Sequence, residues 1–99
     1  MGMYTVRRDL FATKGSDVTS EVYWVGDARS ISLQLDASVQ TVRGSNDDGR
    51  SAAIANWSTL TVITDPDWAM LDIEPGFRWL QVQRSGSTGT ALLQLQQLV

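Results

Sequence analysis

Neither cysteine nor histidine occurs among the 99 residues, and lysine occurs once against seven arginines. Without cysteine the chain has no disulfide and no thiolate metal site. Without histidine it lacks the usual general base at neutral pH and the commonest metal ligand. A nucleophile would have to be a serine or threonine activated by Lys14 or by a carboxylate. No such set stands out, so we expect no enzyme, no cofactor and no metal site.

Charge and hydropathy exclude two further classes. The formal net charge is −3 and the basic residues are scattered, which is the wrong balance for binding nucleic acid. No apolar run approaches the roughly 18 residues of a membrane span, and the stretch MGMYTVRRDLF lacks the apolar region of a secretory signal. We therefore expect a chain that folds in a cytoplasm and binds neither nucleic acid nor a membrane. The bias toward arginine points to a protein partner, because arginine is favoured at protein interfaces.

The dominant pattern in the sequence is period-two alternation, which is typical of half-buried β-strands. In ISLQLD, Ile31, Leu33 and Leu35 alternate with polar residues, and ALLQLQ repeats the pattern. Further stretches rich in β-branched and aromatic residues, separated by turn residues, lie at 21–25, 38–44, 57–63, 68–73 and 77–84. The pattern predicts an all-β protein: an antiparallel β-sandwich, jelly-roll-like, of about seven to eight short strands.

Three regions depart from regular alternation. Residues 1–18 predict an irregular N-terminal arm or an edge strand, ahead of a sandwich domain over 19–99. In FRWLQVQR, Leu80 and Val82 share a face, which leaves Trp79 on the opposite face, and LQLQQLV shifts phase between Gln96 and Gln97. We favour a β-bulge in each of these two strands, and the alternative is an apolar stripe on the outer face.

The stretch NDDG at 46–49 raises the question of a small metal loop. Asp47 and Asp48 are adjacent, whereas a calcium loop takes ligands at alternate positions and a bidentate glutamate at its end. Asparagine, aspartate and glycine tolerate positive φ angles, so we predict a tight turn after a strand instead.

Four tryptophans are more than a domain of this size buries easily. We expect Trp24, and with it Trp57, in the core. Trp68 follows a turn and Trp79 lies in a strand with disturbed alternation, so both are candidates for a surface that meets a partner or ligand. Exposed tryptophans suit either protein anchors or stacking platforms for sugars.

The succession of strands and turns from about residue 30 to 95 resembles small β-sandwich structural proteins of tailed bacteriophages. In those proteins a GSNDG-like turn is followed by W-x-x-L, then by a G-x-R-W-L-x-V strand and a Ser/Gly/Thr turn into the last strand. The matching residues here are Gly44, Ser45, Asn46, Asp47, Trp57, Leu60, Gly76, Arg78, Trp79, Leu80 and Val82. The stretch GRSAAIAN before Trp57 is longer than the corresponding part of that pattern.

The resemblance implies a virion protein assembled in the host cytoplasm. A chain of this size is most similar to a capsid decoration (cement) protein that binds the outside of the major capsid protein and self-associates as a trimer. Similar folds occur in carbohydrate-binding modules, so the alternative is such a module, or a small tail or head-fibre component used in host attachment, with Trp68 and Trp79 as sugar platforms. Partner contacts are expected at Tyr4, Arg7, Arg8, Trp68, Trp79, Leu98 and Val99.

Overall fold

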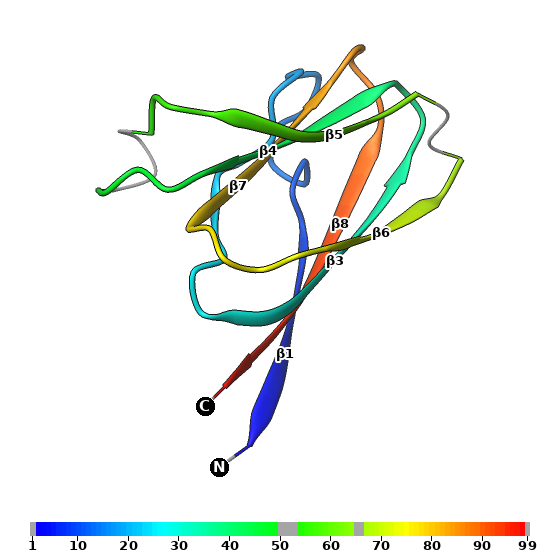
Figure 1. Ribbon diagram of the computed structural model, residues 1–99. Coiled ribbons are helices and arrows are strands. Elements are labelled where there is room, and N and C mark those ends of the chain that lie inside the picture. Colours follow the sequence, from blue (N-terminus) through cyan, green and yellow to red (C-terminus); the bar gives the residue numbers. More distant parts are fainter. Residues whose placement is uncertain (1, 50–53, 65–66, 99) are drawn as a thin grey trace.

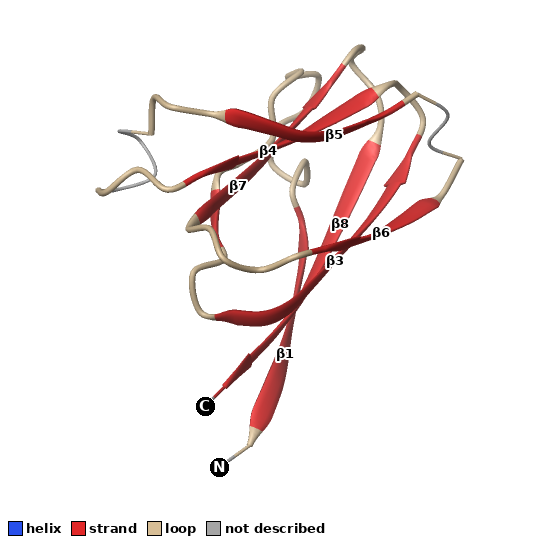
Figure 2. Cartoon of the chain, viewed as in Figure 1, coloured by secondary structure: helices blue, strands red, loops and turns tan. Residues whose placement is uncertain are grey.

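The computed structural model describes residues 2–49, 54–64 and 67–98, which form eight β-strands (Figures 1 and 2). Within these ranges the chain forms no helix, and hence none that is long and apolar enough to cross a membrane. The strands are β1 (Met3–Asp9), β2 (Tyr23–Trp24), β3 (Ala28–Asp36), β4 (Gln40–Ser45), β5 (Ser58–Ile63), β6 (Ala69–Ile73), β7 (Trp79–Arg84) and β8 (Thr90–Leu98).

The strands form two four-stranded antiparallel sheets. Sheet A has the strand order β1-β8-β3-β6, and sheet B has the order β2-β7-β4-β5. The pairings β1–β8, β2–β7, β3–β6 and β4–β5 are nested, as if one long hairpin had been wound into a sandwich. This is the jelly-roll arrangement, and the predicted fold class is confirmed.

The core lies between the sheets and is built mainly from alternate residues of the predicted strands. The two sheets supply most of its buried apolar side chains. Sheet A contributes Ile31, Leu33, Leu35, Ala91, Leu93 and Leu95, and sheet B contributes Val42, Leu80 and Val82. Each such side chain contributes about 1.5–3 kcal/mol relative to leaving it exposed, the smaller Ala91 less. The period-two pattern in the sequence is therefore the direct cause of the two-layer packing.

The N-terminal segment is part of the sandwich. Strand β1 is an edge strand that pairs with β8 along its whole length, so that the two chain ends lie side by side (Figure 1). The loop that follows buries Leu10 and Phe11 in the core. Of the two alternatives for residues 1–18, an irregular arm or an edge strand, residues 3–9 form the edge strand. Burial of two consecutive large apolar side chains, Leu10 and Phe11, then ties the following loop to the core.

The bulge predicted in β7 is wrong. Strand β7 pairs with β4 without a register shift, so Leu80, Val82 and Arg84 point into the sandwich and Trp79 points out. The alternative, an apolar side chain on the outer face, is correct for Trp79. The partner of Trp79 is not a residue of its own strand but Trp24, which lies opposite it on β2.

The bulge predicted near the end of β8 is also wrong. Alternation continues through Leu95 to Gln97, which is itself buried, and the pairing with β1 is regular throughout. The irregularity lies in the neighbouring strand β3, where the register shifts between Ala28 and Ser30. The apparent change of phase in the sequence arises because a polar residue, Gln97, occupies an inward position of β8, which the pattern of apolar residues alone does not distinguish from a bulge.

The register of β4 with β7 defines two ends of the sandwich. Ser45 pairs with Trp79 at one end and Gln40 pairs with Arg84 at the other. The Trp79 end carries the β2–β3, β4–β5 and β6–β7 connections, and the Arg84 end carries the β3–β4, β5–β6 and β7–β8 connections. These two names are used below.

Candidate functional site

Large apolar side chains are exposed in several places on the described surface. They lie on both outer sheet faces, in the connections and near the start of β1, and they are Met3, Tyr4, Val18, Trp24, Val39, Leu60, Val62, Trp68, Met70 and Leu92. Single exposed apolar residues are ordinary, so a site is indicated only where they adjoin a hollow or one another. Three regions meet this condition: the Trp79 end, the outer face of sheet A and the hollow beside Val18 in the 10–22 connection.

Trp24 and Trp79 form an edge-to-face pair on the outer face of sheet B. Their ring centroids are 5.0 Å apart with an interplanar angle of 74°. The Trp24 indole donates a hydrogen bond to Asp27 Oδ2 and the Trp79 indole donates one to the carbonyl oxygen of Asp47, both at 3.1 Å. The polar atom of each indole is thus satisfied within the chain, and Trp24 remains 39 % exposed. The prediction that Trp24 belongs to the core is wrong, because its pairing with Trp79 puts it on the outer face.

Trp57 is also outside the core cluster. It is half-buried, and the guanidinium carbon of Arg43 lies 5.2 Å from the centre of one of its rings. Arg43 also donates a hydrogen bond to the side chain of Gln81. Partial burial lowers the pKa of the Arg43 guanidinium from its ordinary value. The prediction that Trp57 accompanies Trp24 in the core is therefore wrong as well, and the core is formed without tryptophan.

Asp47 holds the two ends of the β4–β5 connection together. Its Oδ2 accepts hydrogen bonds from the backbone N–H groups of Ala55 and Asn56, both at 2.9 Å, and its Oδ1 accepts one from Asn56 Nδ2 at 3.0 Å. These bonds, with the one from the Asn56 backbone first, lower the pKa of Asp47 below its ordinary value. Asp48 forms an ion pair with Arg78. Both carboxylates therefore have structural tasks within the chain.

The prediction of a tight turn at 46–49 is right about a change of direction and wrong about its length. Strand β4 ends at Ser45 and β5 begins only at Ser58, so the connection is a long loop fastened by Asp47. Gly49 does adopt a positive φ of 119°. Across the described residues, no three His, Cys, Asp or Glu side chains are grouped as metal ligands.

Two hollows at the Trp79 end adjoin each other. One, of about 390 Å³, lies along the β4–β5 connection, and the other, of about 550 Å³, lies between that connection and Trp24. Asn46 and Phe77 line both. We call the two hollows together the end trough. Neither Asn46 nor Phe77 was singled out as a site residue in the sequence.

The outer face of sheet A carries the second region. Cross-strand register places Asp9, Leu92, Gln34 and Met70 in one row across the four strands. Met70 is 62 % exposed and, with Leu92, lines a hollow of about 350 Å³. We call it the Met70 hollow. The Met70 hollow was not predicted from the sequence, although the alternation of the two strands indicates it. Ala69 and Leu71 face inward on β6, which leaves Met70 on the outer face. Ala91 and Leu93 face inward on β8, which leaves Leu92 on the outer face.

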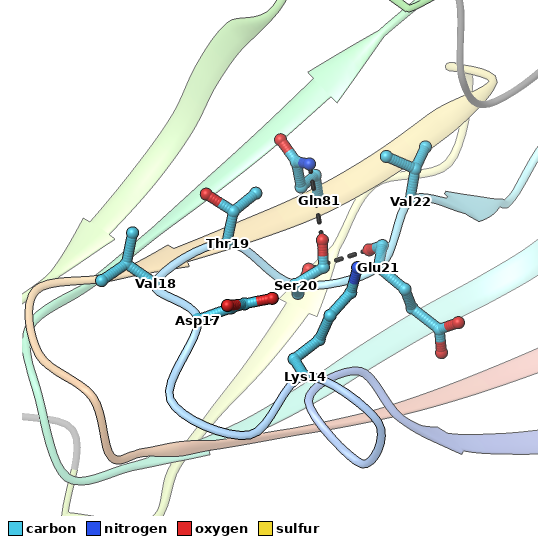
Figure 3. Close-up of a pocket in the computed structure, with 8 residues that line it drawn as sticks. All are labelled: Lys14, Asp17, Val18, Thr19, Ser20, Glu21, Val22 and Gln81. Carbon is cyan, nitrogen blue, oxygen red and sulfur yellow. Dashed lines mark hydrogen bonds between the residues drawn. The ribbon is translucent and has the colours of Figure 1, made fainter.

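A further hollow, of about 620 Å³, is lined in part by the only lysine of the sequence, Lys14 (Figure 3). The Lys14 side chain extends along Ser20 toward the backbone of Glu21 (Figure 3). The Ser20 hydroxyl is buried, donates to the Glu21 carbonyl at 2.8 Å and accepts from the backbone N–H of Val82 at 2.9 Å. Ser20 fastens the 10–22 connection to the edge of β7, and its hydroxyl is not presented to the hollow as a nucleophile would be.

The predicted contact residues are not brought together in one place. Tyr4, Arg7 and Arg8 lie on β1 and Leu98 ends β8, whereas Val99 lies outside the described residues. Arg7 lines the Met70 hollow and donates to Gln94 at 3.0 Å.

Arg8 lines the same hollow but is engaged elsewhere. It pairs with Glu21 at 2.6 Å, an interaction that raises the pKa of Arg8, and it lies over the ring of Tyr23. Trp68 is 49 % exposed with a φ of 54° and precedes β6 at the Arg84 end. Trp68 and Trp79 are therefore at opposite ends of the sandwich, and one ligand of ordinary size cannot use both.

The chain matches no protein-family model, no curated protein and no solved structure. Two hollows of this surface have a geometry that suits binding, the Met70 hollow and the end trough. The Met70 hollow is a sheet face with an apolar centre and a polar rim, which suits docking to a protein. The end trough combines aromatic walls with planar polar side chains, which suits a small ligand.

Proposed function

We propose that this protein is a structural component of a tailed-bacteriophage virion, and specifically a capsid decoration protein. In this proposal it binds the outside of the shell formed by the major capsid protein and stabilises that shell. Self-association as a trimer on the shell belongs to the same proposal. The sequence resemblance of residues 30–95 to such proteins is the starting point, and the Met70 hollow is the structural observation that supports it best.

The Met70 hollow has the anatomy of a docking surface. Two large apolar side chains, Met70 and Leu92, are bordered by the polar residues Gln34 and Gln94 and by Arg7. An apolar centre with a polar rim is usual where one protein surface meets another, and arginine is favoured at such places over lysine. A sheet also holds its outer side chains in a fixed arrangement, which lowers the entropy lost on docking.

Stabilisation of the shell follows from mass action. A protein that binds the assembled shell and not its separated subunits adds its binding free energy to the stability of the assembly. Covering Met70 and the exposed part of Leu92 contributes on the order of 2–4 kcal/mol per copy. This is modest for one copy, but a shell repeats the contact over many equivalent subunits.

The experiment uses shells from which the protein has been stripped. Wild-type protein is expected to rebind and to restore resistance to heating, and Met70→Glu is expected to bind at least about tenfold more weakly because a carboxylate would be buried in the contact. Val62→Glu is the matched control, since Val62 is an exposed apolar residue on the outer face of the opposite sheet.

Two results contradict the proposal. One is that stripped shells resist heating as well as complete ones. The other is that Met70→Glu rebinds like the wild type while its urea unfolding curve shows that it is folded. If Val62→Glu weakened binding to the shell as much as Met70→Glu does, the Met70 hollow would not be the docking surface.

A further inference from the structure

We infer that the end trough is a binding site for a neutral saccharide. The trough lies at the Trp79 end, where Trp24 at the end of β2, Asn46 and Asn56 in the β4–β5 connection, and Phe77 and Arg78 in the β6–β7 connection line it. The inference goes beyond the proposed role on the capsid, because it concerns a different surface and a different class of ligand.

The aromatic wall of the trough is rigid. The Trp24 ring packs directly on the backbone of Gly26, where a Cβ atom would lie 2.3 Å from Trp24 Cζ2. The edge-to-face contact with Trp79 and the hydrogen bond from the Trp24 indole to Asp27 hold the Trp24 ring in place. Because the indole N–H is already used, the exposed part of the ring offers only hydrocarbon surface. The C–H face of a pyranose ring is the kind of surface that packs on such a wall.

Two polar side chains of the trough, Arg78 and Asn56, are planar and already held by other residues. Arg78 Nη1 donates to the carbonyl oxygen of Asn46 at 3.1 Å, which ties the β6–β7 connection to the β4–β5 connection. Asn56 is held by Asp47 through both its backbone and its side chain. A side-chain amide offers a donor and an acceptor in one plane, which matches two hydroxyl groups on adjacent ring carbons. Groups ordered before binding lose little entropy when the ligand arrives.

The charge of the trough selects a neutral ligand. Arg78 is paired with Asp48, and Asp47 adds a further carboxylate to the lining. The local balance is acidic, which disfavours phosphate, sulfate and nucleotides. An uncharged hydroxyl-rich ring meets no such repulsion.

The test is a titration of the full chain, followed by the backbone and side-chain amide signals in two-dimensional NMR. The probes are glucose, galactose, mannose, N-acetylglucosamine and short β1,4-linked oligomers of glucose and of N-acetylglucosamine, each up to about 50 mM, because single sugar sites commonly bind in the millimolar range. At least one probe is expected to shift the Trp24 and Trp79 indole signals and the Asn46 and Asn56 side-chain signals, and no probe is expected to shift the Trp68 indole.

Variants locate the site. Trp24→Ala is expected to weaken binding at least about tenfold. Asn46→Ala, in an exposed connection, is expected to weaken it while leaving the dispersion of the spectrum unchanged, so the test holds even if Trp24→Ala unfolds. Trp68→Ala is the matched control, because it removes an indole that is even more exposed, at the opposite end, and it is expected to bind like the wild type.

Three results overturn the inference: no probe shifts the trough signals, both trough variants bind like the wild type, or inorganic phosphate or a proline-rich peptide shifts the trough signals more than any sugar does. None of these results bears on the capsid proposal, which is tested separately on stripped shells and purified virions.

Discussion

Arg84 is expected to be the most sensitive single side chain of the fold. It is 6 % exposed and points into the sandwich from β7. Its Nε donates to the carbonyl oxygen of Asp17 at 2.9 Å, its Nη1 to that of Gly89 at 2.7 Å and its Nη2 to that of Gly15 at 2.6 Å. The guanidinium carbon lies 4.0 Å from the centre of the Phe11 ring. One side chain thus joins the 10–22 connection, the β7–β8 connection and the core.

Arg84→Met removes the guanidinium and keeps much of the side-chain length. Each hydrogen bond from a charged donor contributes about 1.5–3 kcal/mol net, and the desolvation of the guanidinium offsets part of the sum. Water can reach some of the released carbonyl groups, so we expect the free energy of unfolding to fall by about 3 kcal/mol. In a domain of about this size that loss lowers the melting temperature by roughly 12–24 °C.

The assay is urea and thermal unfolding, followed by tryptophan fluorescence and circular dichroism. Arg84→Lys is expected to fall between the wild type and Arg84→Met, because an ammonium group keeps the charge but cannot reach three carbonyls in three directions. Arg78→Met is the control: it removes an exposed ion pair with Asp48 and an exposed hydrogen bond to the Asn46 carbonyl oxygen, so it should cost clearly less than Arg84→Met, about 1 kcal/mol at most. A loss below about 0.5 kcal/mol for Arg84→Met, which is within the range of ordinary surface changes, would refute the reasoning.

Three further predictions follow from single contacts. The pKa of Asp47 is lowered in the folded chain, so its contribution to stability is present above the ordinary pKa and is lost as pH falls through the folded value. Protonation of Asp47 and Asp47→Asn should both lower the protection of the Asn56 amide against hydrogen exchange, measured as the exchange rate relative to the intrinsic rate at the same pH, and unchanged protection would contradict the role of Asp47 in holding the loop. Ser20→Ala leaves a buried backbone N–H on β7 without its acceptor and should cost about 1–3 kcal/mol in urea unfolding, whereas an unchanged midpoint would contradict this. Gly44→Ala places a Cβ atom 3.0 Å from Phe77 Cδ2 and should cost about 1 kcal/mol, so that a gain in stability would show that the ring moves freely.

The elements that could be predicted from the sequence are those in which local pattern and final burial coincide. Strand β3 is the clearest example, since Ile31, Leu33 and Leu35 alternate with polar residues and all three are buried. The antiparallel sandwich follows from many such short stretches separated by turn residues.

Predictions failed where burial depends on a partner distant in sequence. Trp24 is large and apolar, which favours the core, but its position opposite Trp79 in the β2–β7 pair puts it outside. The local sequence pattern also does not indicate the burial of Arg84, which depends on the carbonyl groups of Gly15, Asp17 and Gly89. Neither outcome is encoded in a window of neighbouring residues, because both depend on which strands and loops meet.

The two candidate sites differ in the same way: one could be predicted from the local alternation of a strand and the other could not. Met70 could have been found from the alternation of β6, because its neighbours Ala69 and Leu71 occupy the inner face. The end trough could not, because Trp24 from β2 and Asn46 and Phe77 from two separate connections are distant in sequence, and only the jelly-roll topology brings them to one end.

The central proposal is most directly tested by the mass ratio of this chain to the major shell protein in purified virions. A decoration protein that stabilises the shell by occupying its repeated subunits should be present at roughly one copy per shell subunit, or per small group of them. A ratio lower by more than an order of magnitude, as expected for a component confined to the tail or to one vertex, or the absence of the chain from the particle, would contradict the proposal.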